Sequence, residues 1–324
     1  MTSPAKIAGI AKSACPAPMT NMTRAQLLRA AAGLSVAALL PLPAASQPSK
    51  KMNTRKIPST GEALPVIGCG TWIGFDKQPG SAEYQRLSGV LQELFAAGGT
   101  MIDSSPMYGR SEETTGELLA AAPPAHKPFL ATKVWTRGRD AGIAQMNQSF
   151  ALLKTERIDL MQVHNLVDWR TQLATVRNWK EQGRVRYAGI THYTASAFGD
   201  VEAVLRSEKL DFLQINYSLD DREVEKRLLP LAAERGVAVI VNQPFGGGGL
   251  LRSLRDKPLP GWAAEIGAAS WAQVLLKFTL SHPAVTCVIP GTSQPAHMAD
   301  NASAGMGTLP DAAFWKRHAA SLPS

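Results

Sequence analysis

The chain has 324 residues, 45% of them hydrophobic and 19% charged, so it can bury a large core and wholesale disorder is excluded. Its formal net charge is +8, but residues 1–46 hold four bases and no acid, which leaves +4 (30 − 26) for the rest. Such a mild excess, without a Lys/Arg-rich run, gives no support for nucleic-acid binding. Three cysteines without CxxC or zinc spacing rule out a disulfide scaffold, and no metal site is predicted.

Residues 24–46 have the pattern of an export signal. Two arginines precede an apolar stretch, Ala30–Leu42, and small residues before Gln47 form an A-x-A-like site. Segment 23–29 resembles a twin-arginine motif in which the second arginine is replaced by Ala25. The apolar run is too short and too Pro-interrupted to span a membrane stably. We predict a signal-like segment over 1–46 and a periplasmic or exported protein; a disordered tail on a cytoplasmic protein is the alternative.

From about Arg55 onward, short apolar runs alternate with amphipathic stretches, which is typical of βαβ units. The predicted strands are Val66–Gly70, Thr100–Asp103, Phe129–Lys133, Ile158–His164, Tyr187–Thr191, Phe212–Asn216, Ala238–Asn242 and Thr286–Pro290. The predicted helices are Tyr84–Ala97, Glu112–Leu119, Ile143–Leu153, Trp169–Glu181, Ala195–Arg206, Glu223–Arg235, Ser270–Ser281 and Asp311–Leu322.

Eight βα units in residues 47–324 predict a single α/β domain, a (β/α)8 TIM barrel. A short hairpin, Arg55–Ile57 with Ala63–Pro65, is expected before the first strand. A doubly wound sheet would require G-x-G-x-x-G after the first strand, and the segment 68–72 lacks the third glycine. The pattern therefore favours the barrel.

Polar residues at the carboxyl ends of three successive strands indicate a proton-transfer site, because barrel active sites lie at that end. These residues are Asp103, Lys133 and His164, with Tyr108 five residues after Asp103. A tyrosine with a pKa of about 10 is a poor acid near neutrality, and an adjacent ammonium lowers that pKa. A carboxylate keeps the ammonium charged, and a histidine can polarise a carbonyl oxygen.

With these residues in place, the chain resembles the aldo-keto reductase family from Arg55 to about Ala304. The resemblance is carried by VIGCGTW (66–72), IDSSPMYGRSEE (102–113), ATKVW (131–135), LMQVHN (160–165), YAGIT (187–191), LQINYS (213–218) and VIPGTSQPAHMADN (288–301). It implies an oxidoreductase that reduces an aldehyde or ketone with a nicotinamide cofactor. Tyr108 would be the general acid, Asp103 and Lys133 would tune its pKa, and His164 would orient the carbonyl.

The resemblance also implies the cofactor site. The implied residues are Gly70, Thr71, Trp72, Thr191, His192, Gln214, Phe245, Gly247, Gly291, Thr292, Ser293, His297, Asp300 and Asn301. Gln214 would bond the carboxamide, while Thr191 and His192 replace the family's Ser-Asn pair. Asn242 stands where the family has the tyrosine that stacks on nicotinamide. The lysine and arginine typical of NADPH-selective members correspond to Gly291 and His297, so NADP(H) is expected over NAD(H) by a narrow margin.

Trp72, Trp135 and Trp169 follow predicted strand ends, where the aromatic walls of a substrate pocket belong. A short C-terminal region predicts an open pocket that accepts several small carbonyl compounds, and we expect a monomer. Cys69 and Cys287 lie on the first and last strands at different heights, which opposes a disulfide between them.

Two other functions stay open at this point. Lys133 at a barrel strand end can form a Schiff base if desolvated, which would suit a lyase or aldolase. A barrel that binds cofactor without turnover is the second alternative, and Asn242 at the stacking position favours it.

Overall fold

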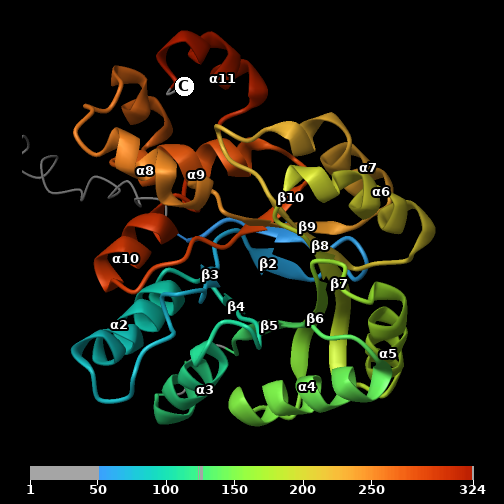
Figure 1. The fold of residues 1–324 in the computed structure, drawn as a ribbon. Coiled ribbons are helices and arrows are strands. Elements are labelled where there is room, and N and C mark those ends of the chain that lie inside the picture. Colours follow the sequence, from blue (N-terminus) through green and yellow to red (C-terminus); the bar gives the residue numbers. More distant parts are fainter. Residues whose placement is uncertain (1–50, 123, 125–126, 323–324) are drawn as a thin grey trace, which may run out of the picture. The chain divides into compact units, whose positions relative to one another are not determined.

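The computed structural model describes residues 51–122, 124 and 127–322; the predicted signal segment lies outside them. Eight parallel strands follow one another around a sheet in chain order, and they confirm the predicted barrel (Figure 1). The strands are β3 (Cys69–Gly70), β4 (Met101–Asp103), β5 (Phe129–Val134), β6 (Ile158–His164), β7 (Val185–Thr191), β8 (Phe212–Asn216), β9 (Ala238–Asn242) and β10 (Val285–Val288).

Parallel bridges between the first and last strands close the barrel. Ile67 pairs with Val288, and Gly70 pairs with Gly291. The N–H of Gly68 donates to the carbonyl of Val288 over 2.9 Å. Because the closing residues flank β3 and β10, these strands leave no open edge there.

Helices cover the outside of the strands (Figure 1). They are α2 (Ala82–Ala96), α3 (Ser111–Ala121), α4 (Arg139–Leu152), α5 (Trp169–Glu181), α6 (Phe198–Ser207), α7 (Leu228–Glu234), α8 (Gly249–Leu254), α9 (Trp271–Ser281), α10 (Pro295–Ser303) and α11 (Ala312–Arg317). Ser81, Ser270 and Asp311 cap α2, α9 and α11 by accepting a backbone N–H. After β9, Gly246–Gly248 form a 3₁₀ turn that leads into α8, a helix absent from the predicted ones.

Side chains alternate between two apolar layers along each strand. In β6, Met161 and Val163 join the core between strands and helices, whereas Leu160 joins the barrel interior. The interior layer takes residues from β4 to β9 and also Cys287, which like Cys69 is a buried free thiol. This two-layer burial explains why the strand sequences read as nearly continuous apolar runs.

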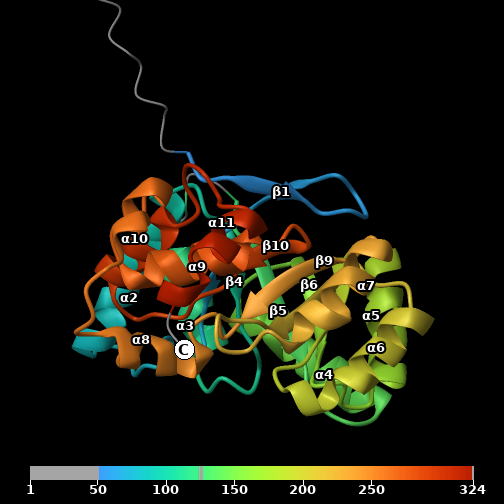
Figure 2. The ribbon, with the colours of Figure 1, turned by 90° about the horizontal axis from the view of Figure 1, so that it is seen from above.

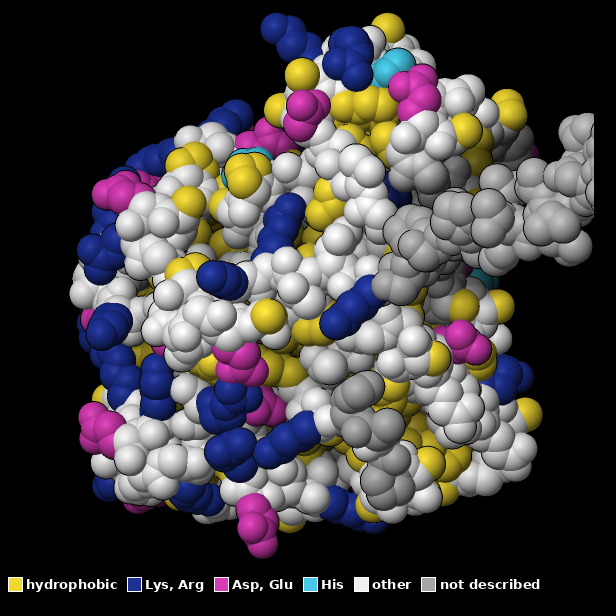
Figure 3. Space-filling model, turned by 180° about the vertical axis from the view of Figure 1, so that it is seen from behind, with side chains coloured by type: hydrophobic (Ala, Val, Ile, Leu, Met, Phe, Trp, Pro, Cys, Tyr) yellow, Lys and Arg dark blue, Asp and Glu magenta, His cyan; other side chains and the backbone are white. Residues whose placement is uncertain are grey.

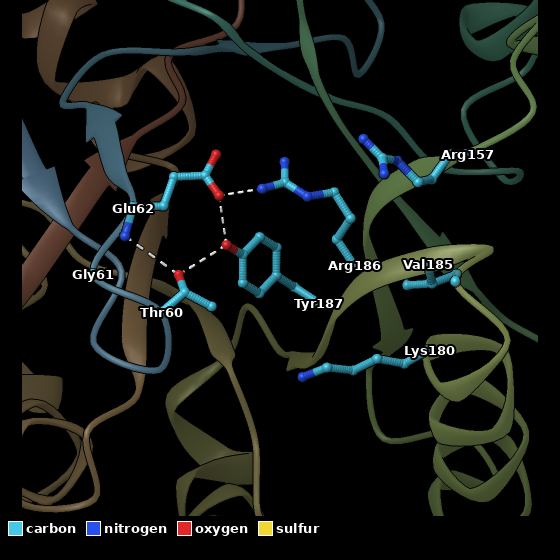
Figure 4. Close-up of a pocket in the computed structure, with 9 residues that line it drawn as sticks. Thr60, Gly61, Glu62, Arg157, Lys180, Val185, Arg186 and Tyr187 are labelled. Atoms are coloured by element: carbon cyan, nitrogen blue, oxygen red, sulfur yellow. Dashed lines mark hydrogen bonds and ion pairs between the residues drawn. The ribbon is translucent and has the colours of Figure 1, made fainter.

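A hairpin of β1 (Thr54–Lys56) and β2 (Ala63–Pro65) lies across the amino-terminal end of the strands (Figure 2). Its side chains Ile57 and Leu64 are buried in the barrel interior. Glu62 accepts hydrogen bonds from Arg186 and from the Tyr187 hydroxyl (Figure 4). The hairpin therefore plugs the end of the barrel opposite the predicted active site.

A hollow of about 670 Å³ lies beside this hairpin. Two of the three cations that line it are already paired: Lys180 with Asp211, and Arg186 with Glu62 and Asp159. These ion pairs fit the stabilising role of a barrel's amino-terminal face.

The surface carries mixed charge. On the face in Figure 3, Lys and Arg side chains are interspersed with Asp and Glu side chains. Within residues 51–122, 124 and 127–322, no helix combines the length and apolar character needed to cross a bilayer.

Candidate active site

The carboxyl ends of β4, β5 and β6 bring the four predicted catalytic residues together. Asp103 ends β4, Lys133 is the last residue but one of β5, and His164 ends β6. Tyr108 lies in the loop after β4, where its N–H donates to the carbonyl of Ser105 over 3.0 Å. Because these strands are neighbours in the sheet, the side chains converge at one end of the barrel.

Lys133 is the buried centre of the site. Its Nζ donates to Asp103 Oδ2 over 2.6 Å and to the carbonyl of Ser104 over 2.7 Å. Nζ also lies over the ring of Tyr108, 5.0 Å from its centroid. Burial alone would lower the pKa of Lys133, but Asp103 and Tyr108 together raise it. Lys133 therefore remains an ammonium ion.

Tyr108 and His164 face each other edge to face, with ring centroids 6.1 Å apart. Burial raises the pKa of Tyr108, and Lys133 opposes this effect. Burial, then the charge of Lys133 and the proximity of His192, lower the pKa of His164 to about 3. Its Nδ1 lies 3.2 Å from Ser105 Oγ. Near neutral pH, the site thus holds a protonated tyrosine, an ammonium and an uncharged imidazole.

Two buried amides hold the other oxygen of Asp103. Gln162 Nε2 and Gln214 Nε2 donate to Oδ1 over 3.0 and 2.8 Å. Sequence reasoning missed Gln162, although a signal was present: it precedes His164 by two residues, so both point into the barrel.

Gln214 does more than the family resemblance implies. Its amide nitrogen donates to Asp103, and its carbonyl accepts from the Thr191 hydroxyl over 3.3 Å. Next to Thr191, the Nδ1 of His192 accepts the N–H groups of Tyr193 and Thr194. Since Nδ1 is an acceptor, His192 carries its proton on Nε2 and can donate there. Burial lowers the pKa of His192, which favours this neutral form.

The glycines assigned to the cofactor site approach each other closely. A Cβ on Gly70 would lie 2.9 Å from the carbonyl oxygen of Ile289, and one on Gly291 would lie 3.2 Å from that of Gly70. Thr71 is buried and donates to Ser104 Oγ over 2.9 Å. Trp72 follows and is exposed. Glycine at both positions lets the backbones meet at the junction of β3 and β10, where a side chain would clash with the facing carbonyl.

The remaining assigned cofactor residues lie after β9 and β10. Phe245 is buried, and Gly247 has φ of +62° with no atom within 4 Å of an added Cβ. Thr292 and Ser293 precede α10, which carries His297, Asp300 and Asn301. Both oxygens of Asp300 are engaged by α9, through Ser270 Oγ and Gln273 Nε2. Asn242 donates to the carbonyl of His192 over 3.4 Å, while its buried Oδ1 has no partner among the described residues.

Apolar side chains surround the mouth of the site. All the exposed large hydrophobic residues of the described chain follow barrel strand ends, and they are 40–60% exposed: Trp72, Ile73, Met107, Trp135 and Tyr193. Trp169 instead packs against the outer core, with Arg170 4.3 Å over its ring.

Backbone strain gathers at the same mouth. Five of the six non-glycine residues with positive φ follow strand ends: Ile73, Asn165, Leu166, Asp168 and Gln243. Such strain persists at functional sites, where the surrounding structure holds it in place. In the described residues, no group of three His, Cys, Asp or Glu side chains could hold a metal ion.

Comparison with known proteins agrees with this geometry. A model of the aldo/keto reductase family matches residues 66–318. The chain is 30% identical over 255 residues to the aldo-keto reductase str7 of Strobilurus tenacellus, covering 66% of this chain and 75% of that protein. It is 26% identical over 242 residues to the NADH-specific methylglyoxal reductase of Escherichia coli, covering 64% and 73%. It spans 61% of the aldo-keto reductase YhdN of Bacillus subtilis, at 27% identity over 206 residues and 59% of this chain.

The solved structures support the fold. An aldo-keto reductase from Klebsiella pneumoniae in complex with NADPH aligns with a TM-score of 0.70 at 24% identity, over 85% of this chain and 96% of that one. The glycerol dehydrogenase AKR11B4 of Gluconobacter oxydans aligns with a TM-score of 0.68 at 21% identity, over 84% and 96%.

Proposed function

Because the chain belongs to the aldo/keto reductase family, we propose that it is a carbonyl reductase that uses NAD(P)H and Tyr108 as proton donor. The observation that carries this proposal is the buried chain of contacts from Asp103 through Lys133 to Tyr108. A charged lysine beside a neutral tyrosine is the arrangement that acid catalysis by a phenol requires.

Each residue has a defined part in the reduction. When bound, the reduced nicotinamide supplies a hydride to the carbonyl carbon. Tyr108 donates its proton to the carbonyl oxygen, and the Lys133 ammonium stabilises the phenolate that remains. With Ser105 Oγ as the donor to Nδ1 of His164, the neutral imidazole presents Nε2–H to the same oxygen. Alcohol oxidation is the reverse of these steps.

The residues at the barrel mouth fit a nicotinamide dinucleotide. At Gly247 no atom lies within 4 Å of an added Cβ, so its backbone admits a close contact with phosphate, and Nε2–H of His192 suits a carboxamide oxygen. We propose NADP(H) over NAD(H), with Thr292 and Ser293 as hydroxyl donors to the 2′-phosphate. One similar structure is solved in complex with NADPH, and one similar protein is an NADH-specific reductase.

The proposed substrates are aldehydes or ketones with an apolar group. Trp72 and Trp135 stand exposed at the mouth, beside Tyr108 in the strand order, and supply apolar surface. Trp169 remains the weakest of the three predicted pocket walls, because it packs toward the core.

The first test is fluorescence titration of residues 47–324 with NADPH and NADH, followed by a panel of aldehydes and ketones. Tyr108→Phe should lower kcat at least about a hundredfold while cofactor binding stays intact. Tyr84→Phe is the matched control, since Tyr84 on α2 bonds Glu117 on α3 and belongs neither to the tetrad nor to the assigned cofactor residues. Full activity of Tyr108→Phe would contradict the proposal, and tighter NADH than NADPH binding would reverse the cofactor preference.

A lyase that acts through a Schiff base is disfavoured. Such chemistry needs Lys133 as a neutral amine, whereas its contacts with Asp103 raise its pKa. Borohydride trapping of a carbonyl substrate on Lys133 would overturn this assignment. A cofactor-binding barrel without turnover predicts NADPH binding but no reduction anywhere in the panel.

We further propose that the chain is exported to the periplasm and acts there as a monomer. The support is the arginine-led apolar segment before Gln47. A reductase needs its cofactor loaded before export, which suits the route that carries folded proteins. Cell fractionation of the full chain and of its Arg24→Gln variant tests the location, and light scattering tests the oligomeric state. A wholly cytoplasmic full chain would refute export.

A further inference from the structure

Gln162 contacts the catalytic carboxylate from inside the barrel. Its side chain is wholly buried on β6, and Nε2 donates to Asp103 Oδ1 over 3.0 Å. If the amide were turned over, Gln162 Oε1 would face Asp103 Oδ1, and two acceptors would oppose each other. The carboxylate therefore fixes the orientation of the amide.

The barrel accommodates this amide at a cost to stability. Gln162 Oε1 is buried and has no partner among the described residues, and an unpaired buried carbonyl destabilises a fold. Its pairing partner on β7 is Gly189, where a Cβ would lie 3.3 Å from Gln162 Cγ and 2.9 Å from the carbonyl oxygen of Phe212. A leucine or methionine would fill the same space without the unpaired oxygen. Packing therefore does not account for glutamine here, whereas the bond to Asp103 does.

The two amides on Oδ1 fix which oxygen of Asp103 faces Lys133. Gln162 and Gln214 hold Oδ1, and Lys133 takes Oδ2 over 2.6 Å. Rotation of the carboxylate would break both amide contacts. The side chain of Gln214 also accepts a hydrogen bond from Thr191, so its position depends on a second residue assigned to the cofactor site. Among the described residues, the side-chain hydrogen bond of Gln162 goes to Asp103.

We propose that Gln162 is a positioning residue for the reduction, holding Asp103 so that Lys133 remains an ammonium ion in contact with Tyr108. This inference rests on the proposed function and adds a residue to it.

Other titratable groups face the same pair. His164 lies near Lys133 and is neutral, since its pKa is lowered to about 3. Glu112 on α3 is buried near Lys133, and burial raises its pKa. The thiols of Cys69 and Cys287 have raised pKa values through burial and then through Asp103. In this surrounding, Asp103 is the carboxylate that contacts Nζ directly.

Gln162→Leu removes the donor and the unpaired oxygen together. We expect kcat to fall about tenfold, as for loss of one hydrogen bond to a charged group, with the Kd for NADPH unchanged. The reduction rate falls as pH rises through the titration of Lys133 and Tyr108. A loosened Asp103 lets the ammonium lose its proton at lower pH, so the alkaline limb of the kcat profile should move down by about 1 unit.

Gln162→Glu gives a second readout that packing alone would not move. A glutamate beside Asp103 has a raised pKa, and its protonated form can donate to Oδ1 as the amide does. Activity of this variant relative to wild type should therefore recover as pH falls from about 8 to 5. Gln172→Leu is the matched control: it too removes a buried glutamine with an unpaired oxygen, but one bonded to Thr136 and Gly138.

The outcomes separate the two proposals. A wild-type chain that binds NADPH but reduces no carbonyl would overturn the proposed function and this inference with it. An active wild type together with a Gln162→Leu variant of equal kcat and equal pH profile would overturn the inference alone. If Gln162→Leu fails to fold, the pH dependence of Gln162→Glu decides. A rise in its activity relative to wild type as pH falls supports the inference, and no such rise overturns it.

Discussion

Lys133→Met would remove the cation from a buried ion pair and leave Asp103 as an uncompensated charge inside the barrel. The separation of 2.6 Å corresponds to an attraction of about 6 kcal/mol at an effective dielectric of about 20. Both side chains are almost wholly inaccessible to water, so much of that attraction offsets the cost of dehydrating the charges. Breaking such a pair from one side typically costs about 3–5 kcal/mol.

Urea unfolding at pH 7 measures this cost. We expect Lys133→Met to lose about 3–5 kcal/mol of unfolding free energy, with a smaller loss in Asp103→Asn because Lys133 keeps the carbonyl of Ser104 as an acceptor. The double variant should recover most of the loss, since no buried charge then lacks a partner. Neither single variant should reduce carbonyl compounds at more than about a hundredth of the wild-type rate.

A loss below about 1 kcal/mol in Lys133→Met would refute this reasoning, because Asp103 would then be protonated or hydrated in the variant at little cost. Equal losses in the double and single variants would show that packing, and not the paired charges, sets the stability of the site.

Three further predictions concern other parts of the barrel. The pKa of His164 is about 3 in the folded chain against about 6.5 unfolded, so the unfolded chain binds more protons between these values. The free energy of unfolding should therefore fall as pH falls below about 6.5, by about 3 kcal/mol at pH 4. In urea unfolding, the His164→Gln variant should not show that decrease. Glu62→Ala should lower unfolding free energy by about 1 kcal/mol by removing one partner each from Arg186 and Tyr187, and unchanged kcat/KM would confirm that the hairpin end is separate from the chemistry. Ile73→Gly should raise unfolding free energy by about 0.5–1 kcal/mol, because Ile73 has φ of +60°, and should weaken turnover of hexanal more than of propanal; a lower melting temperature would contradict this.

Much of the fold could be predicted from the sequence because the strands are buried on both sides. The predicted ranges of β6, β8 and β9 agree with the structure residue for residue, and β5 extends one residue further. Helices α8 and α10 were missed, since α8 opens with glycines and α10 opens with Pro295 after polar residues. Local pattern does not distinguish such starts from loops.

The tetrad was predictable because its members end consecutive strands, so strand order alone brings them together. The amide contacts on Asp103 were not, because they join β4 to β6 and β8 across the barrel interior. Likewise, the orientation of Trp169 depends on how α5 packs against the core, which the position of a residue after a strand does not determine.

The bridge between Gly70 and Gly291 determines when the barrel can close during synthesis of the chain. The two glycines are 221 residues apart (291 − 70), so at about 5–20 residues per second the ribosome releases the second roughly 10–40 s after the first. Until β10 is made, β3 can pair with β4 on one side but has no partner on the other. The nascent barrel is thus an open sheet until its last strand emerges. A chain truncated before β10 would retain all four catalytic residues, but the edge of β3 would be unpaired and prone to associate with other chains.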